Sequence, residues 1–193
     1  MLVVIPFRAG GKSRLPEELR VEVALAMLGD VVEAALEVGH TRVVTDDPAG
    51  RMVARELGAE PVDDPGGGQG AAVAAALEDA GGICLVVNAD LPRARPSDLG
   101  ALAVPPRLGA AAIVEARDGT TNALGLPHAE AFRPLYGPGS ARRFREHAAA
   151  IELPVNGLAL PNLVEDVDTL ADLARLGRHG GPRTRAILGV IAR

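Results

Sequence analysis

The chain has 193 residues, a length typical of one domain of ordinary size. Hydrophobic residues make up 48% of it and aromatic residues only 2%, which excludes a disordered chain and predicts a core of alanine, valine, leucine and isoleucine. The formal net charge of -5 argues against a protein that binds nucleic acid through its charge, because such proteins are basic. The only cysteine, Cys84, excludes a disulfide framework within the chain.

The sequence shows no sign of export or membrane insertion. No apolar run reaches the length of a membrane-spanning helix. The N-terminus has neither the basic start nor the cleavage site of a secretory signal. We therefore expect a cytoplasmic protein with neither a membrane nor a nucleic acid as its partner.

Apolar runs of strand length alternate with helical patterns in the first half of the chain. The run LVVIPF predicts a buried strand, and the helical spacing that starts at Pro16 predicts a long helix that ends near Gly39, with a kink at Gly29. Strands are then predicted at 41–47, 59–64 and 83–90, and helices at 49–58, 69–81 and 96–104. This alternation, with runs rich in valine, isoleucine and leucine, is typical of a parallel sheet covered by helices on both faces.

The pattern changes after Pro105. Two strands, GAAAIVEAR and NALGLP, are joined by the tight turn DGTT. A helix is predicted at 140–150, a strand near 151–155 and an acidic loop at 164–169, followed by helices at 169–177 and 182–193. No internal repeat or long linker divides the chain, so we predict an α/β fold with a mostly parallel, twisted sheet in one domain, residues 1–193.

The segment FRAGGKSRLP follows the first predicted strand and contains the only lysine of the chain. It lies at the carboxyl edge of the sheet, where open parallel sheets bind ligands. Gly10 and Gly11 allow backbone amides to point at a phosphate, and Lys12 and Arg14 add two cations. The spacing is not that of a P-loop, and a surface turn with two solvated charges is the alternative.

Acidic residues mark two further candidate positions. Asp90 ends a hydrophobic strand in VVNADLP, and VEDVDT contains Glu165, Asp166 and Asp168. In an extended segment Asp166 and Asp168 face the same side, and together with Asp90 across a cleft they form a candidate Mg²⁺ site. The alternatives are a turn or cap at Asp90 and a solvated acidic turn in which Asp168 or Thr169 caps the next helix.

Three glycine-containing turns are candidate ligand loops. PGGGQG, residues 65–70, is short and dense in glycine, which suits a ligand loop better than a joint between domains. DGTTNAL and YGPGSARRF are the other two, and Ser140 in the second is predicted to be an N-cap. The amides at that helix start form a candidate anion site. The arginines of this helix either reach the anion or form a solvated face; they are Arg142, Arg143 and Arg145.

Taken in this order, the segments resemble the guanylyltransferases of coenzyme F(420) biosynthesis, which act on 2-phospho-L-lactate or, in actinobacteria, on phosphoenolpyruvate. The resemblance covers nearly the whole chain and rests on an ordered set of motifs: VVIPF…KSRL, LAMLGDVVEAA, DDPGGG, ADLP, GTTNAL, YGPGS and EDVDT. It implies a three-layer nucleotidyltransferase fold like that of the nucleotide-diphospho-sugar transferases, and allows a homodimer.

The resemblance also implies a reaction and a role for each candidate residue. GMP would move from GTP to the phosphate of the acceptor, with release of diphosphate. Asp90, Asp166 and Asp168 would hold Mg²⁺, and Lys12 and Arg14 would hold the GTP phosphates. The other implied contacts are Arg8, in place of a second lysine, and Gly66, Gly67, Gly68 and Gln69 for GTP, with Asn122, Gly137 and Ser140 for the acceptor.

The chain departs from the family pattern in two places. The first loop is about two residues shorter, and Gln69 and Gly70 replace the Leu-Asn pair that relatives commonly carry, so a nucleotide contact made by that asparagine is missing or shifted. The alternatives are a nucleotidyltransferase that acts on molybdopterin or a sugar phosphate, and an inactive nucleotide-binding regulatory domain. The sequence does not choose between phosphoenolpyruvate, 2-phospho-L-lactate and 3-phosphoglycerate, although its composition favours the first.

Overall fold

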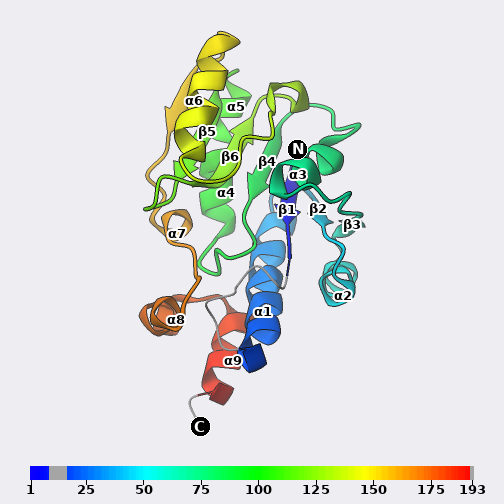
Figure 1. Cartoon of the computed structure of the whole chain (residues 1–193), viewed down its shortest axis with the longest axis vertical. Helices are drawn as coiled ribbons and strands as arrows, with labels where there is room; N and C mark the ends of the chain where they lie inside the picture. Colours follow the sequence, from blue (N-terminus) through cyan, green and yellow to red (C-terminus); the bar gives the residue numbers. More distant parts are fainter. Residues whose placement is uncertain (9–16, 192–193) are drawn as a thin grey trace.

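The computed structural model describes residues 1–8 and 17–191, and within them seven strands form one sheet in the order β3-β2-β1-β4-β6-β5-β7 (Figure 1). The strands are β1 (Leu2–Pro6), β2 (His40–Val44), β3 (Glu60–Val62), β4 (Cys84–Val87), β5 (Ala111–Glu115), β6 (Thr121–Leu126) and β7 (Val155–Gly157). The predicted α/β fold is therefore confirmed.

The order of the parallel strands places a ligand-binding edge beside β1. β1 pairs in parallel with β2 on one side and with β4 on the other, and β3 pairs in parallel with β2. The chain thus builds outward from β1 in one direction and returns to its other side for β4. Open α/β sheets bind ligands at such a reversal, beyond the carboxyl ends of the strands. Phe7 and Arg8, which follow Pro6, and the loop after Val87 occupy that position.

The second half of the sheet is mixed. β6 runs antiparallel to both β4 and β5, and β7 pairs in parallel with β5. The tight turn between β5 and β6 explains the antiparallel pairing, because a short connection can only reverse the chain. The sheet is mostly but not wholly parallel.

Helices cover both faces of the sheet (Figure 1). Side chains of α1, α2, α4 and α7 pack on one face, and those of α3 and α6 pack on the other. The longer helices are α1 (Glu17–Leu36), α2 (Pro48–Leu57), α3 (Gln69–Leu77), α4 (Pro96–Leu102), α6 (Ser140–Ala150), α8 (Leu170–Leu176) and α9 (Pro182–Ile191). The short ones are α5 (Val104–Arg107), η2 (Ala129–Ala131), α7 (Pro161–Val164) and η3 (Gly177–His179).

The side chains of β1 show how the core divides. Val3 and Ile5 belong to the hydrophobic cluster that contains α1, whereas Leu2 and Val4 belong to the cluster that contains α3. Successive side chains of a strand point to opposite faces, so a central strand covered on both sides must be apolar throughout. This is why LVVIPF is a continuous apolar run.

The C-terminal helices α8 and α9 pack against α1 (Figure 1). A third cluster joins Val23 and Met27 of α1 to Val167 and to α8. Helix α1 runs through Gly29 as one helix, and the kink at this residue stays a prediction. Gly29 makes room for α9, because an added Cβ atom would lie 2.5 Å from Cδ of Arg183.

The element boundaries differ from the prediction mainly at strand ends. The predicted strands 41–47 and 83–90 end earlier, at Val44 and Val87, and the polar residues that follow make side-chain hydrogen bonds. Asp47, for example, caps α2 by accepting hydrogen bonds from the amides of Ala49 and Gly50. The strand expected near 151–155 begins only at Val155, which pairs with Ala111.

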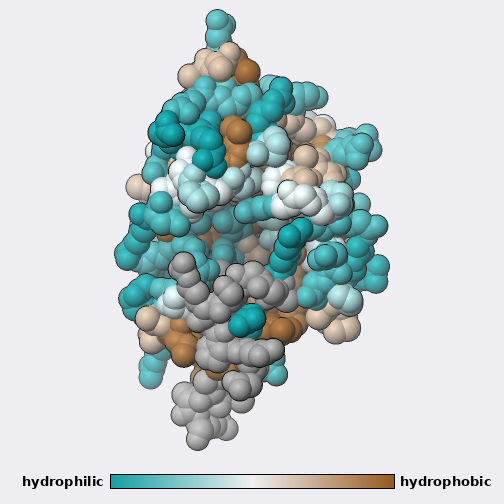
Figure 2. All heavy atoms as spheres, in the orientation of Figure 1, coloured by the Kyte–Doolittle hydropathy of each residue, from teal (hydrophilic) through white to brown (hydrophobic). Residues whose placement is uncertain are grey.

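The surface is largely polar. On the face shown in Figure 2, hydrophilic residues predominate and hydrophobic ones occur in small scattered groups. The exposed large hydrophobic side chains come from separate elements, among them Met52 of α2, Val104 of α5 and Leu170 of α8. None of the helices within residues 1–8 and 17–191 has both the length and the apolar character needed to cross a membrane.

Two glycines in the sheet and its covering helix should respond in opposite ways to alanine. A Cβ atom at Gly125 of β6 would lie 2.7 Å from the carbonyl oxygen of Leu102 and 2.9 Å from Cγ of Pro106, so Gly125→Ala should lower the free energy of unfolding by about 1–3 kcal/mol through overpacking. Gly100 of α4 has open space around the same position, so Gly100→Ala should raise it by about 0.5–1 kcal/mol. Urea unfolding of both variants measures these changes, and equal effects of the same sign would contradict this packing.

Candidate active site

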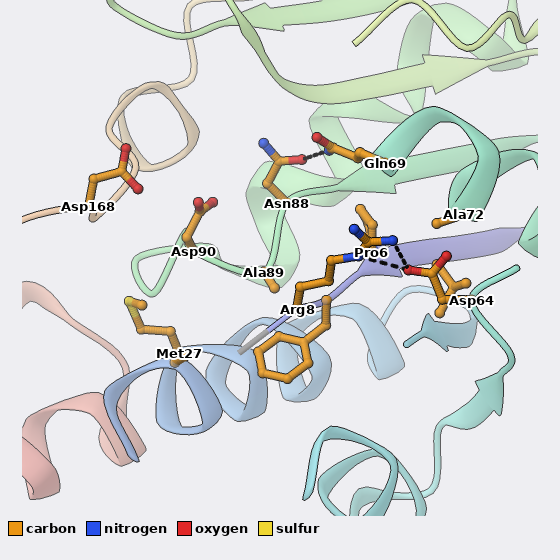
Figure 3. A pocket seen from close by; sticks show the side chains of 13 residues that line it. Pro6, Arg8, Met27, Asp64, Gln69, Ala72, Asn88, Ala89, Asp90 and Asp168 are labelled. Carbon is orange, nitrogen blue, oxygen red and sulfur yellow. Dashed lines mark hydrogen bonds and ion pairs between the residues drawn. The ribbon is translucent and has the colours of Figure 1, made fainter. Parts of the chain in front are cut away.

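A cavity of about 230 Å³ lies beyond the carboxyl ends of β1 and β4. Its apolar lining includes Phe7 after β1 and Ala24 and Met27 of α1. Its polar lining residues are Arg8, Asp64, Gln69, Asn88, Asp90 and Asp168. Figure 3 shows Arg8 with Asp64 on one side of the cavity and Asp90 with Asp168 on the other. We refer to the side that holds the Arg8–Asp64 ion pair as the cationic part of the cavity, after Arg8, and to the side with Asp90 and Asp168 as the acidic part.

The structure brings together the three acids that the sequence paired. Asp90 follows β4, and Asp166 and Asp168 lie in the loop between α7 and α8. One carboxylate oxygen from each of the three lies within 4.8 Å of the others, and all three residues are half-buried. Like charges this close are costly unless a cation neutralises them, and carboxylate oxygens are suitable ligands for a hard divalent cation.

Burial of Val167 sets the direction of the two acids beside it. Val167 is 3% exposed and packs between α1 and α8, and its amide donates a hydrogen bond of 3.1 Å to the carbonyl oxygen of Asp90. Alternate side chains of an extended segment point in opposite directions, so Asp166 and Asp168 point away from this core. The same hydrogen bond connects their loop to Asp90, in the loop after β4.

Thr169 caps α8, so the alternative in which Asp168 is the cap is excluded. The Thr169 hydroxyl accepts a hydrogen bond of 3.1 Å from the amide of Asp172, and the Asp172 carboxylate accepts hydrogen bonds from the amides of Asp168 and Thr169. Burial acts to raise the pKa of Asp172, but these hydrogen bonds and Arg175 lower it overall. The Asp168 side chain is thus not used for the cap.

Glu165, the third acid of the VEDVDT segment, has a different environment. It forms ion pairs with Arg93, at 3.3 Å, and with Arg117. These pairs connect the acidic loop to the loops that follow β4 and β5. Glu165 is therefore separated in role from Asp166 and Asp168.

Asp64 organises the cationic part of the cavity. One of its carboxylate oxygens accepts hydrogen bonds from Nε and Nη2 of Arg8, at 2.9 and 2.8 Å, and the other accepts one of 2.9 Å from the amide of Gly66. The Asp64 side chain is 2% exposed and that of Arg8 is 48% exposed. This contact raises the pKa of Arg8 and fixes its guanidinium at the mouth of the cavity.

The glycine loop has a conformation that other residues rarely adopt. Gly66, Gly67 and Gly68 have φ values of 81°, 83° and 95°, and α3 begins immediately afterwards. Gln69 at the start of α3 donates a hydrogen bond of 2.8 Å to Asn88. The loop and β4 are therefore connected through two side-chain amides that line the cavity.

The residues predicted for an acceptor have well-defined contacts. The Asn122 side chain is buried, and its amide group donates to the carbonyl oxygens of Leu163 and Val164, at 3.0 and 3.1 Å. It thereby holds the start of the acidic loop against β6. A contact of Asn122 with an acceptor stays a prediction.

Ser140 is not the N-cap of α6, and that prediction is wrong. The cap is Gly139, with a φ of 69°, and Ser140 is the first helical residue. The Ser140 hydroxyl is fully buried and donates a hydrogen bond of 3.0 Å to the hydroxyl of Thr121. Gly137, with a φ of 111°, forms the turn before it. Contacts of Ser140 and Gly137 with an acceptor stay predictions.

The three arginines of α6 are engaged within the chain. Arg142 pairs with Glu146 at 2.7 Å, and Arg145 pairs with Glu115 at 2.8 Å. Arg143 donates to the carbonyl oxygens of the turn before the helix, including that of Leu135. These contacts favour a structural role over the anion-binding alternative.

Two predicted residues and two unforeseen ones complete the comparison with the sequence. Lys12 and Arg14 lie outside the described residues, so their predicted roles stay predictions. Asp64 and Asn88 line the cavity and were not predicted. Both lie within motifs quoted above, Asp64 in DDPGGG and Asn88 in VVNADLP two residues before Asp90, and that position is the signal that could have identified them.

Comparison with known proteins assigns this chain to the nucleotidyltransferases. A family model described as the MobA-like NTP transferase domain matches residues 9–160. A Desulfovibrio desulfuricans protein assigned as a nucleotide-diphospho-sugar transferase shares the fold, with a TM-score of 0.79 at 17% identity over 97% of this chain and 93% of that one.

Relatives that align over most of their length narrow the assignment further. The phosphoenolpyruvate guanylyltransferase of Streptomyces scabiei is 39% identical over 95% of this chain and 94% of that protein. The 2-phospho-L-lactate guanylyltransferase of Natrialba magadii is 36% identical over 93% and 84%. The chain therefore belongs to the MobA-like NTP transferase family and, within it, to the group of phosphoenolpyruvate and 2-phospho-L-lactate guanylyltransferases.

If Asp90, Asp166 and Asp168 form a cation site, loss of one carboxylate should weaken it. We expect Asp90→Asn and Asp168→Asn to raise the dissociation constant for Mn²⁺ at least about tenfold, as measured by electron paramagnetic resonance. Asp79→Asn is the matched control, because Asp79 is exposed in the turn after α3 and its φ of 61° suits asparagine. Unchanged affinity in both site variants would show that the triad does not hold the cation.

Proposed function

We propose that the chain is a guanylyltransferase that moves GMP from GTP onto the phosphate of phosphoenolpyruvate or 2-phospho-L-lactate, in the biosynthesis of coenzyme F(420). The observation that carries the proposal is the convergence of three carboxylates beside a cavity at the carboxyl edge of the sheet, in a chain related over its length to enzymes of that name. Fold similarity alone would assign no activity.

The reaction joins two anions through phosphorus. An oxygen of the acceptor phosphate attacks the α-phosphorus of GTP, a new P–O bond forms, and the bond between the α-phosphorus and the bridging oxygen to the β-phosphorus breaks. The electron pair leaves with diphosphate. Such a step needs no covalent bond to the protein, because positioning and neutralisation of charge lower its barrier.

The acidic triad is proposed to hold Mg²⁺. Asp90, Asp166 and Asp168 supply hard oxygen ligands, the kind that Mg²⁺ prefers. When bound, Mg²⁺ would neutralise negative charge on the reacting phosphates. The three carboxylates by themselves would repel both substrates, so their proximity is consistent with a site that needs a cation to work.

The cationic part is proposed to hold the triphosphate. Asp64 accepts hydrogen bonds from Nε and Nη2 of Arg8 and so holds the guanidinium at the mouth of the cavity. The hydrogens on Nη1 take no part in that pair. Lys12 and Arg14, assigned by the family resemblance, would hold the GTP phosphates and stabilise the departing diphosphate. A guanidinium fixed before the substrate arrives loses little freedom on binding.

The nucleoside is proposed to lie along the glycine loop and Gln69. The left-handed conformation of Gly66 to Gly68 turns this backbone at the start of α3, beside Gln69 and Asn88. For the acceptor we assign the turn at Gly137. The predicted acceptor contacts of Asn122 and Ser140 belong to the same proposal; within the fold, Asn122 holds the start of the acidic loop and Ser140 bonds Thr121 of β6.

Two other functions differ from this one in measurable ways. Another nucleotidyltransferase of the MobA-like family would use a different acceptor, and an inactive regulatory domain would bind nucleotide without releasing diphosphate. Incubation with GTP and Mg²⁺ and an equimolar mixture of phosphoenolpyruvate, 2-phospho-L-lactate and 3-phosphoglycerate, followed by mass spectrometry, should show a guanosine diphosphate ester of one of the first two. No new ester, or equal turnover with ATP and CTP, would contradict the proposal.

The glycine loop allows a second prediction with a matched control. Gly67 and Gly82 both have left-handed φ values, 83° and 76°, so alanine should cost each variant about 1–2 kcal/mol of stability. Only Gly67 lies in the proposed nucleotide loop, and its Cβ atom would also approach that of Ala71 to 3.3 Å. Gly67→Ala should therefore raise the KM for GTP about tenfold, equivalent to roughly 1.4 kcal/mol. An equal rise in Gly82→Ala would contradict a role of this loop in binding GTP.

A further inference from the structure

Asp30 of α1 is a buried carboxylate that the proposed reaction does not use. The residue is 5% exposed. It accepts hydrogen bonds from the amide of Arg183 at 2.9 Å, and from the amide and hydroxyl of Thr184 at 2.9 and 2.6 Å. Thr184 is itself 1% exposed. Asp30 thus satisfies the first turn of α9 as an N-cap side chain would, although it belongs to another helix.

Gly181, directly before α9, lies between Asp30 and the loop that follows β4. Its amide donates a hydrogen bond of 2.6 Å to the carbonyl oxygen of Pro92. A Cβ atom at Gly181 would lie 2.2 Å from Cγ of Asp30, so no larger residue fits while Asp30 holds α9. We refer to Asp30, Gly181 and Thr184 as the C-terminal clasp.

The hydrogen bond from Gly181 reaches Pro92, which lies two residues after Asp90 of the acidic triad. Pro92 follows Asp90 and Leu91, and Leu91 is completely buried. On the other side of this short segment, the amide of Val167 donates to the carbonyl oxygen of Asp90. The backbone around Asp90 is therefore held by two hydrogen bonds donated from the chain beyond residue 160, where the match to the family model ends.

We propose that the C-terminal clasp sets the position of Asp90 within the acidic triad, so that Asp30, Gly181 and Thr184 are positioning residues for the bound cation. Three carboxylates within 4.8 Å of one another repel, and the hydrogen bonds at Asp90 and Pro92 hold the backbone that carries one of them beside the other two. Docking of α9 on α1 through Asp30 supplies that hold at Pro92. The inference rests on the proposed function only in taking the triad as a cation site.

The test uses the full chain without nucleotide. Thr184→Val removes the hydroxyl donor and keeps the shape of the side chain, Asp30→Asn replaces one acceptor oxygen by an amide, and Thr184→Ser restores the hydroxyl. Hydrogen exchange of peptides spanning 84–95 reports on the Asp90 loop, and Mn²⁺ affinity by electron paramagnetic resonance reports on the triad. We expect faster exchange in 84–95 and about tenfold weaker Mn²⁺ binding in Thr184→Val and Asp30→Asn, as when an outer-shell partner is lost.

Glu33→Ala is the matched control, because Glu33 also joins α1 to α9, through the Arg183 side chain at 2.9 Å, without contacting the backbone of the clasp. It should behave like wild type, as should Thr184→Ser. Unchanged exchange or unchanged Mn²⁺ affinity in the folded Thr184→Val and Asp30→Asn variants would overturn the proposal, as would a wild-type chain that does not bind Mn²⁺. Normal Mn²⁺ binding without guanylyl transfer would instead overturn the proposed function and leave the clasp intact.

Discussion

The candidate site depends on one backbone hydrogen bond, from the amide of Val167 to the carbonyl oxygen of Asp90. It connects the loop after a central parallel strand with a loop near the C-terminus. Val167 can make it because its side chain is buried against α1 and α8, which fixes the backbone on either side. Asp166 and Asp168 then point away from the core by simple alternation. An apolar contact, which carries no charge itself, thus places two carboxylates beside a third.

In the opposite part of the cavity one buried residue again positions two features of the site, but here the residue is charged. Asp64 is nearly inaccessible, yet one oxygen holds the Arg8 guanidinium and the other holds the amide that begins the glycine loop. A buried carboxylate would be unfavourable without such partners. The position of the cation and that of the loop are consequently coupled. A triphosphate bound here would meet both features in a fixed relation.

The sequence predicted those parts of the fold and site that depend on local pattern. The apolar run of β1, the exact extent of α6 and the convergence of Asp90 with Asp166 and Asp168 follow from burial on both faces, helical periodicity and strand alternation. The contact of Asp64 with the cavity could not be predicted because its partner Arg8 is distant in sequence. Ser140 was misassigned as a cap because its hydroxyl instead bonds Thr121 of β6, a contact that appears only once the sheet has formed.

The chain beyond residue 160 is therefore part of the catalytic apparatus in this interpretation, rather than an appendage to the matched family domain. A chain ending there would keep all seven strands of the described sheet but lose Asp166 and Asp168, the clasp on Pro92 and the cover over Val23 and Met27. The apolar residues of α8 and α9 bury one side of α1, and the same docking places Asp166 and Asp168 close to Asp90. Burial of that surface and assembly of the acidic triad therefore depend on the same helix packing. The stability of the C-terminal helices is thus coupled to the geometry of the site.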